Sequence, residues 1–169
     1  MPGTHPAAIK IETLLRGCDV RRSRASGPGG QHRNKVETAV TVVHRSTGIR
    51  GAASERRSQE QNRREAIFRL RLNLALSWRV RRDLPCVPSC LWRQRCCRGA
   101  LRVNPQHDDF PGILAEALDV IAAMAFAVPE AAEALGCTTS QLVKLLRVEP
   151  QALSWVNNQR AQANLPPLR

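Results

Sequence analysis

The chain has 169 residues, of which 26 are Lys or Arg and 14 are Asp or Glu, giving a formal net charge of +12. This length fits one domain, or one domain with an appendage, and excludes a large multidomain enzyme. An apolar fraction of 43% with interspersed acids argues against a disordered basic tail, and the charge favours a polyanionic partner.

The N-terminal half of the chain predicts a hairpin and a long helix. We expect a short helix over 7–16 that ends at Gly17 and an extended segment over 19–24. Two strands should follow over 38–44 and 49–53, joined by a turn. Ser58 and Gln61 have the spacing of a capping box and open an amphipathic helix over 58–76. Its apolar stripe can cover one face of the hairpin, which gives a two-layer unit with a basic outer face.

A linker is predicted to follow this unit. From residue 78 to 106 the apolar periodicity disappears, and Pro and Gly interrupt a stretch that holds seven arginines and four of the six cysteines. Apolar residues at helical spacing then run from Ile113 to Val128. The sequence therefore predicts a second, helical unit beyond a basic linker.

The helical unit contains a helix-turn-helix spacing over residues 132–146. Its second helix carries only one cation, Lys144, so we favour a structural or protein-contact role over DNA reading. We expect Trp155 and Leu165 to pack against this unit.

The positive charge is concentrated in the first part of the chain. Residues 1–111 hold 22 basic and 9 acidic side chains, whereas residues 112–169 hold 4 and 5. Only three of the basic residues are lysines, and arginine suits phosphates and base edges, although a GC-rich genome explains the same ratio equally well. The polyanion-binding surface is therefore predicted in the first part.

The sequence gives no sign of a membrane span or of export. The apolar stretch 113–128 is interrupted by Glu116 and Asp119 and is shorter than the ~18–20 residues that a span needs. Residues 1–10 lack the apolar core of a secretory signal, so we expect a cytoplasmic protein with no membrane partner. We expect reduced thiols and no disulfide bridges at the cysteines, which are Cys18, Cys86, Cys90, Cys96, Cys97 and Cys137.

The most informative segment is Arg24-Ala25-Ser26-Gly27-Pro28-Gly29-Gly30-Gln31-His32-Arg33-Asn34-Lys35. Its glycines let the backbone take positive φ and approach a ligand closely, so the segment can present N–H groups to an anion. From these properties alone, an ordinary Gly/Pro surface loop is an equally good interpretation.

The full pattern resembles the Gly-Gly-Gln loop of class I peptide chain release factors and of the related ribosome-rescue peptidyl-tRNA hydrolases. The resemblance covers about residues 19–76 and rests on three blocks, which are the loop residues Arg24, Ser26, Gly27, Gly29, Gly30, Gln31, Asn34 and Lys35, the turn Thr47-Gly48, and Arg57-Ser58-Gln59 with Asn62. It implies an α+β fold class, a small two-layer catalytic domain of sheet and long helix.

The chain departs from the family pattern in two respects. Arg33 stands where the family commonly has a small apolar residue, so the local packing or the loop angle differs. About 18 residues precede the strand that enters the loop, which leaves no room for the region that reads stop codons in release factors. The resemblance therefore points to codon-independent release, as in ribosome rescue.

The resemblance implies hydrolysis of the ester between a nascent peptide and P-site tRNA. A glutamine amide is neutral and cannot act as a general base, so Gln31 works by geometry: its backbone N–H stabilises the oxyanion and its side chain orients a water. The implied catalytic residues are Gly29, Gly30 and Gln31. The implied partners are ribosomal RNA, P-site peptidyl-tRNA and a methyltransferase that modifies Gln31, and no cofactor is expected.

The basic residues that flank the loop are expected to hold ribosomal RNA phosphates. As a group these cations are Arg21, Arg22, Arg24, Arg33, Lys35, Arg56, Arg57, Arg63 and Arg64. The candidate RNA-binding residues are Arg24, Ser26, Gly27, His32, Arg33, Asn34, Lys35, Arg57 and Gln59. The arginine-rich stretch 79–102 is a candidate substitute for the basic tail of rescue factors, but it lies in the middle of the chain.

Other site chemistries fit the sequence less well. The four histidines share no nucleophile or metal spacing with other residues, and for His32 we favour an RNA contact or packing. The cysteines at 86, 90, 96 and 97 lack the paired spacing of ordinary zinc sites, so we expect no metal.

Two alternative functions stay open, a non-catalytic ribosomal-RNA-binding protein that kept the fold and a helix-turn-helix nucleic-acid binder. The predicted domains are 1–77 (catalytic), 78–107 (linker) and 108–169 (helical).

Overall fold

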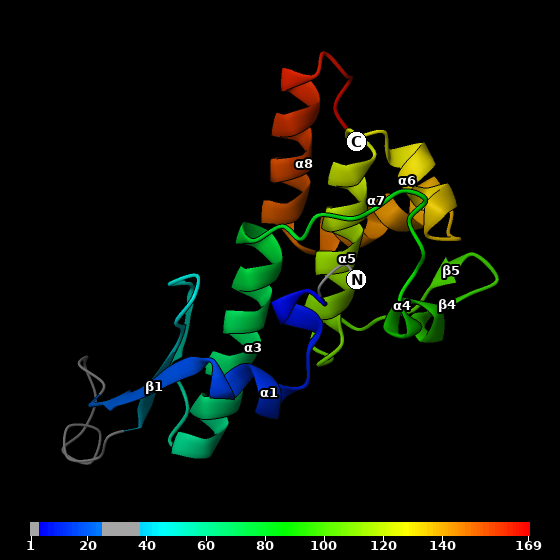
Figure 1. The fold of residues 1–169 in the computed structure, drawn as a ribbon. Coiled ribbons are helices and arrows are strands. Elements are labelled where there is room, and N and C mark those ends of the chain that lie inside the picture. Colours follow the sequence, from blue (N-terminus) through cyan, green and yellow to red (C-terminus); the bar gives the residue numbers. More distant parts are fainter. Residues whose placement is uncertain (1–3, 25–37) are drawn as a thin grey trace.

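The computed structural model describes residues 4–24 and 38–169. It contains helices and small antiparallel sheets, as the predicted α+β class requires. Figure 1 shows a small sheet at one end, the long helix α3 in the middle and the C-terminal helices at the other end. Across these two ranges no helix combines the length and the apolar character that crossing a bilayer would demand.

The sheet has three antiparallel strands in the order β1-β2-β3. The strands are β1 (Cys18–Ser23), β2 (Ala39–His44) and β3 (Arg50–Ala53), which confirms the predicted extended segment and hairpin. Val40 and Val42 of β2 and Ala53 of β3 are buried on the face that packs against α3. Because side chains alternate along a strand, Arg50 and Ala52 of β3 point to the opposite face, where they are exposed.

Helix α3 (Gln59–Ser77) lies between the sheet and the helical unit. Ser58 caps it by accepting a hydrogen bond from the backbone N–H of Gln61 at 3.4 Å, as predicted. The predicted stripe of Ile67, Leu70 and Leu74 belongs to the core beneath the sheet. A second apolar stripe packs against the core of the helical unit and consists of Phe68, Leu72 and Leu76. Helix α3 therefore has two apolar faces, and much less of it is a basic outer face than the sequence suggested.

Strand β3 approaches α3 so closely that only glycine fits at position 51. A Cβ atom there would lie 2.2 Å from the carbonyl oxygen of Ala66 and 2.2 Å from the backbone nitrogen of Leu70. Real Cβ atoms do not come that near to a rigid backbone. Gly51 thus sets the distance between the sheet and the helix.

The N-terminal residues form two short helical segments where one helix over 7–16 was predicted. They are η1 (Pro6–Ala8) and α1 (Ile11–Arg16), and α1 ends at Gly17 as expected. The break has a physical cause, because the carbonyl of Ala7 accepts a hydrogen bond from the buried guanidinium of Arg71 at 2.9 Å. In a continuous helix that carbonyl would accept from the N–H four residues later.

His5 fastens the N-terminus to the end of α3. Its Nδ1 accepts a hydrogen bond from the backbone N–H of Ala7 at 3.0 Å, so Nε2 carries the proton and donates to the carbonyl of Trp78 at 3.1 Å. Burial is the main cause that lowers the pKa of His5 from 6.5 to about 4. The imidazole is therefore a neutral structural link.

Helix α5 (Phe110–Ala123) is buried along nearly its whole length. It is shorter than the predicted run to Val128, because Ala125 and Phe126 take positive φ and turn the chain after Ala123. Two buried carboxylates of α5, Glu116 and Asp119, hold the segment before it, a role described below.

The stretch predicted to be a featureless linker contains regular structure. It includes α4 (Cys90–Arg95) and a two-stranded antiparallel sheet of β4 (Cys96–Cys97) and β5 (Ala100–Leu101). A six-residue helix has too little periodicity to be seen in a sequence and depends on tertiary packing. Here the anchor is Trp92, which is fully buried and donates its indole N–H to the carbonyl of Leu135 at 2.8 Å.

Buried carboxylates bind the same stretch to α5. Glu116 accepts hydrogen bonds from the backbone N–H of Ser89 at 2.7 Å and from its hydroxyl at 2.5 Å. Asp119 accepts from the backbone N–H of Val80 at 3.1 Å and pairs with Arg79 at 3.4 Å. The acids that interrupt the apolar run of α5 are therefore partners for the preceding segment. The domain boundaries at 77 and 107 stay a prediction.

Three further helices complete the chain. They are α6 (Val128–Ala134), α7 (Thr139–Val148) and α8 (Pro150–Gln162). Helices α6 and α7 meet at a turn where Gly136 has a φ of +66°, which matches the predicted helix-turn-helix order. Trp155 packs against this core as expected and makes an edge-to-face contact with Phe126 at 5.5 Å between ring centroids. Leu165, also expected there, is only partly buried.

Candidate functional site

The two ends of the Gly-Gly-Gln segment are held side by side by the sheet. Ser23 of β1 pairs with Ala39 of β2 as the last rung of the antiparallel ladder, so residues 24 and 38 follow directly from adjacent backbone positions. Cα atoms on such a rung lie about 5 Å apart. The segment thus begins and ends at the same end of two adjacent, hydrogen-bonded strands.

Most of the predicted site residues lie outside the described part of the chain. These are the catalytic Gly29, Gly30 and Gln31 and the RNA-binding candidates Ser26, Gly27, His32, Arg33, Asn34 and Lys35. The remaining candidates are described: Arg24 and Arg57 are exposed, and Gln59 is partly buried at the start of α3. Their assigned roles stay predictions.

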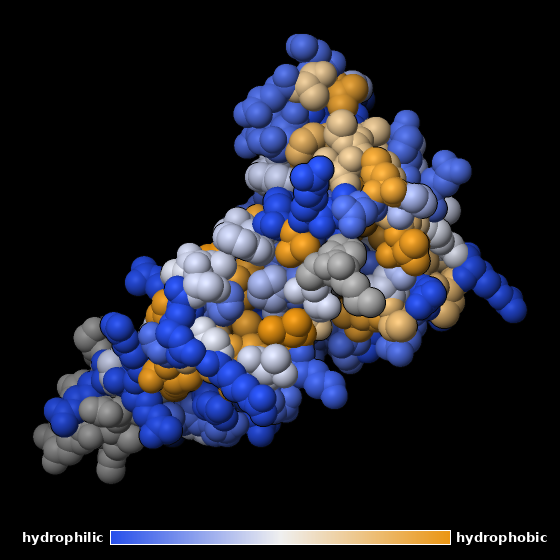
Figure 2. Space-filling view, viewed as in Figure 1, coloured by the Kyte–Doolittle hydropathy of each residue, from blue (hydrophilic) through white to orange (hydrophobic). Residues whose placement is uncertain are grey.

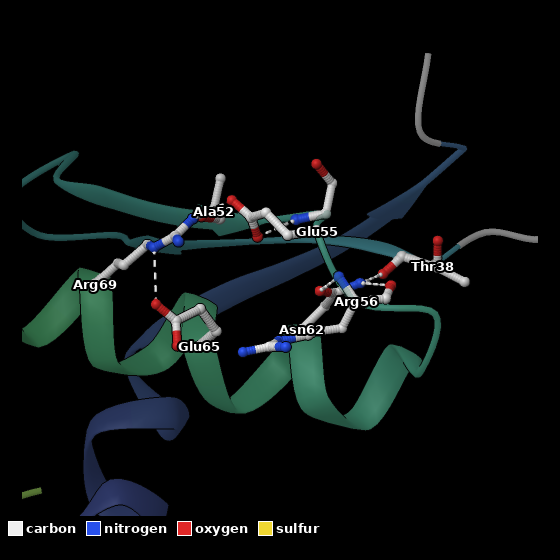
Figure 3. Close-up of polar contacts among 8 residues, drawn as sticks. Thr38, Ala52, Glu55, Arg56, Asn62, Glu65 and Arg69 are labelled. Atoms are coloured by element: carbon white, nitrogen blue, oxygen red, sulfur yellow. Dashed lines mark hydrogen bonds and ion pairs between the residues drawn. The ribbon is translucent and has the colours of Figure 1, made fainter. Parts of the chain in front are cut away.

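Asn62 joins the base of this segment to helix α3. Its side chain is fully buried, and its Nδ2 donates to the main-chain oxygens of Thr38 at 2.7 Å and Arg56 at 2.8 Å. Its Oδ1 accepts from the backbone N–H of Arg56 at 2.9 Å. Figure 3 shows these three bonds converging on one amide. Asn62 therefore brings Thr38, at the end of the segment, next to the turn that carries Arg57.

This clamp explains the position of Asn62 in the sequence. An amide near the start of a helix can bond the preceding loop, and here it satisfies three backbone groups that would otherwise be unpaired. The sequence identified Asn62 only as part of a resemblance, because Thr38 lies 24 residues away and its proximity follows from tertiary structure.

A second polar cluster steadies the loop between β3 and α3. Arg69 donates to Glu55 at 2.7 Å, to Glu65 at 3.0 Å and to the main-chain oxygen of Ala52 at 2.8 Å (Figure 3). The hydrogen bond from Arg69 is the main cause that lowers the pKa of Glu55 to about 2. These groups are largely exposed, so the cluster positions the loop more than it stabilises the fold.

The arginines of α3 are partly neutralised by neighbouring acids. Arg63 and Arg64 both pair with Glu60, at 3.8 Å and 3.4 Å. The predicted basic face of this helix is consequently weaker than its arginine count suggests.

Strand β1 keeps its cations free. Cys18 is its only buried residue, so the strand extends beyond the cover of α3. Arg21 and Arg22 are both exposed and, as neighbours in a strand, project to opposite faces of the sheet. Within the described ranges neither has an acidic partner. Figure 2 shows hydrophilic side chains gathered at this end of the molecule.

The histidines and cysteines form no competing centre in residues 4–24 and 38–169. His44 bonds the hydroxyl of Thr47 at 2.9 Å, and His107 lies 3.5 Å from the carboxylate of Asp109. No three His, Cys, Asp or Glu side chains within these ranges form a group that could hold a metal ion. The six cysteines are free thiols.

Comparison with protein families identifies the part of the chain around the site. Residues 8–83 match the RF-1 domain family. This span includes the three-stranded sheet, the segment between β1 and β2, and the whole of α3. No solved structure matches the chain with significance.

Curated relatives match the chain over stretches of 66–74 residues. A chloroplastic peptide chain release factor of Arabidopsis thaliana is 42% identical over 74 residues, 44% of this chain and 16% of its own length. Peptide chain release factor 1 of Acidiphilium cryptum is 45% identical over 71 residues, 41% of this chain and 20% of its own. Peptide chain release factor 2 of Caulobacter vibrioides is 50% identical over 66 residues, 38% of this chain and 18% of its own. The chain thus spans a fifth or less of the length of these relatives, and its N-terminal half is class I release factor-like.

Proposed function

We propose that this protein hydrolyses the ester bond of peptidyl-tRNA on cytoplasmic ribosomes and does so without reading a stop codon. The observation that carries the proposal is Gly29-Gly30-Gln31 in the segment between β1 and β2, within the residues that match the RF-1 domain. The similar proteins named above are peptide chain release factors, which supports peptide release as the reaction.

In the proposed reaction, water attacks the ester carbonyl and the bond to the tRNA ribose breaks. Gln31 supplies no proton-accepting base, because a carboxamide is neutral. Its backbone N–H donates to the oxyanion that develops on the carbonyl, and its side chain orients the water. Loss of one such donor raises a barrier by about 2.7–4 kcal/mol, which is about 10²–10³ in rate.

Gly29 and Gly30 serve this geometry. Without a Cβ, their backbone can adopt conformations that other residues avoid and can come close to the reacting carbon. The sheet and Asn62 support the proposal by fixing both ends of the segment, since such a donor must be held within a fraction of an ångström.

Cationic side chains would hold the site against ribosomal RNA. Arg21, Arg22 and Arg24 are exposed on and beside β1, and Arg57 is exposed at the start of α3. Phosphate contacts of this kind fix orientation and weaken with salt. We also propose that a methyltransferase modifies Gln31.

Codon independence is the more specific part of the proposal. Its support is that the likeness to release factors extends over only 66–74 residues in these relatives, and that the match to the RF-1 domain is limited to residues 8–83. The rest of the chain as given consists of the arginine-rich stretch and helices that pack on α3 and α5.

The test measures nascent peptide release from ribosomes stalled on a message without a stop codon. Wild type should release peptide. Gly30→Ala, which displaces the backbone N–H of Gln31, should release it about 10²-fold more slowly. Gln31→Ala keeps that N–H but loses the side chain that orients the water, so it should release peptide at least about 10-fold more slowly. Gln151→Ala, an exposed glutamine of α8, is the matched control and should behave like wild type.

The outcomes separate the parts of the proposal. Release by wild type only at stop codons would contradict codon independence. Equal release by all four proteins would contradict the role of Gln31, and RNA binding without any release would favour a non-catalytic ribosomal-RNA-binding protein.

A further inference from the structure

Residues 89–104 form a cationic surface separate from strand β1 (Figure 1). They contain four arginines and no acidic residue: Arg93, Arg95, Arg98 and Arg102. Helix α4 and the β4–β5 hairpin lie across α5 from the three-stranded sheet (Figure 1). We name α4 and this hairpin, residues 90–101, together with Arg102, the arginine hairpin unit.

The unit is a fixed structure, so its cations hold defined positions. Trp92 is fully buried beneath it, and Ser89 caps α4 by accepting from the backbone N–H of Trp92 at 3.0 Å. The backbone N–H of Arg102 donates to the carbonyl of Arg95 at 2.8 Å, which places Arg102 beside the end of α4. The stretch is therefore not a loose basic tail.

Three of its four arginines are uncompensated. Arg95 pairs with Asp109 at 2.5 Å, but Arg93, Arg98 and Arg102 are exposed and have no acidic partner in the described part of the chain. On α3, by contrast, Arg63, Arg64 and Arg69 are all paired with glutamates. The arginine hairpin unit thus carries three arginines that form no ion pair within the described residues.

Arg98 occupies a position that does not favour arginine. It forms the two-residue hairpin turn with Gly99, and both have positive φ, +51° and +76°. Such turns strongly prefer Asn-Gly or Asp-Gly, and a left-handed conformation costs an ordinary residue about 1–2 kcal/mol. Arg98 thus raises the energy of its own turn while its side chain is exposed at the tip of the hairpin. Such a cost at an exposed position suggests a role in binding another molecule.

The surface fits an RNA backbone better than a protein. A protein interface has an apolar centre, whereas phosphate contacts need only donors with positive charge. The large hydrophobic side chains that are exposed in the described residues are Val20, Trp78, Leu84, Val87 and Val148, and none lies in 89–104. Arginine also matches phosphate oxygens with a planar pair of N–H donors.

We propose that the arginine hairpin unit is a second RNA-binding surface, which holds backbone phosphates through Arg93, Arg98 and Arg102. It is distinct from strand β1 and goes beyond peptide release, because it requires no chemistry at Gln31. The chain then has two RNA contacts, one at β1 and its loop and one across α5.

The test compares two double variants of the full chain that lose the same charge. Arg98→Asn with Arg102→Gln removes two contacts of the proposed surface, and Lys144→Gln with Arg147→Gln removes two exposed cations of α7. The affinity for a fluorescent single-stranded RNA of about 20 nucleotides is measured at salt concentrations from about 0.05 to about 0.3 M. The slope of log affinity against log salt reports the number of phosphate contacts. Thermal unfolding is measured on the same samples.

The hairpin variant should reduce the slope of log affinity against log salt by about 1.4, about 0.7 for each contact, and weaken binding about 25-fold at about 0.1 M salt. Its melting temperature should not fall, because Asn is favoured at the turn position. The α7 variant should keep the wild-type slope. Gln31→Ala should keep it too, because a neutral side chain makes no phosphate ion pair. Failure of the second RNA-binding surface is therefore distinguishable from failure of the proposed reaction.

Two results would overturn the proposal. One is an equal change of slope, or none, in both double variants. The other is polyglutamate binding with the same dependence on Arg98 and Arg102 as RNA, because the surface would then recognise acidic polypeptide.

Discussion

Replacing Asn62 by alanine should loosen the candidate loop at its base. The change removes three hydrogen bonds of 2.7–2.9 Å from a fully buried side chain and leaves backbone groups of Thr38 and Arg56 without partners. At about 1 kcal/mol for each bond, the free energy of unfolding should fall by about 3 kcal/mol. Urea unfolding followed by circular dichroism should show a lower midpoint with an unchanged slope.

Asn73→Ala is the matched control. Asn73 lies on the same helix and also donates its Nδ2 to a backbone oxygen, that of Arg50 at 2.8 Å, but this bond is exposed and far along α3 from the loop. We expect a loss below about 1 kcal/mol. Asn62→Asp keeps the acceptor for the N–H of Arg56 but turns two donations into contacts between oxygens, so it should destabilise at least as much as alanine at neutral pH.

The release assay distinguishes positioning from simple destabilisation. At a temperature where Asn62→Ala is folded, its kcat should fall about 10- to 100-fold with a smaller change in KM, because in the proposed reaction a displaced loop misplaces the backbone N–H of Gln31. If Asn62→Ala unfolds within about 0.5 kcal/mol of Asn73→Ala and releases peptide at the wild-type rate, the clamp does not position the loop.

Three further predictions test the packing of the fold, the first with a glycine control. Gly51→Ala should lower the free energy of unfolding by about 3 kcal/mol or more, because the new Cβ meets the backbone of α3 at 2.2 Å. Gly48→Ala is the control: Gly48 has a φ of +70° and open space around it, so this change should cost only about 1–2 kcal/mol. Equal urea midpoints for the two variants would refute the close approach of β3 to α3. The pKa of His5 is about 4 in the folded protein and 6.5 in the unfolded chain, so between these values the imidazole binds a proton only in the unfolded chain. The free energy of unfolding should therefore rise with pH over this window. Acidification through the window should lower it by about 3 kcal/mol. His5→Gln should flatten that part of the pH profile, and an unchanged profile would exclude His5 as its source. Trp92→Phe should leave the carbonyl of Leu135 unpaired and destabilise by about 2–3 kcal/mol, with faster proteolysis within 79–104; unchanged proteolysis would show that Trp92 does not anchor this stretch.

Signals carried by neighbouring residues made much of the N-terminal half predictable. The β-branched run before the Thr47-Gly48 turn predicted β2 and β3, and Ser58 with Gln61 predicted the start of α3. The Gly-Gly-Gln segment and the concentration of arginines in the first 111 residues are likewise properties of the sequence. Roles for Gly29, Gly30 and Gln31 stay predictions, since these residues lie outside the described part of the chain.

The partners of these elements were decided only by tertiary structure. Asn62 meets Thr38 across 24 residues and Trp92 meets Leu135 across 43, and no local pattern encodes such distances. The same holds for charge, because the sequence gives the number of arginines but not which of them pair with an acidic side chain. Period, capping and turn preferences arise from interactions within a few residues, so a sequence displays them directly. The second apolar face of α3, the clamp at Asn62 and the uncompensated cations of the arginine hairpin unit exist only once distant segments pack together.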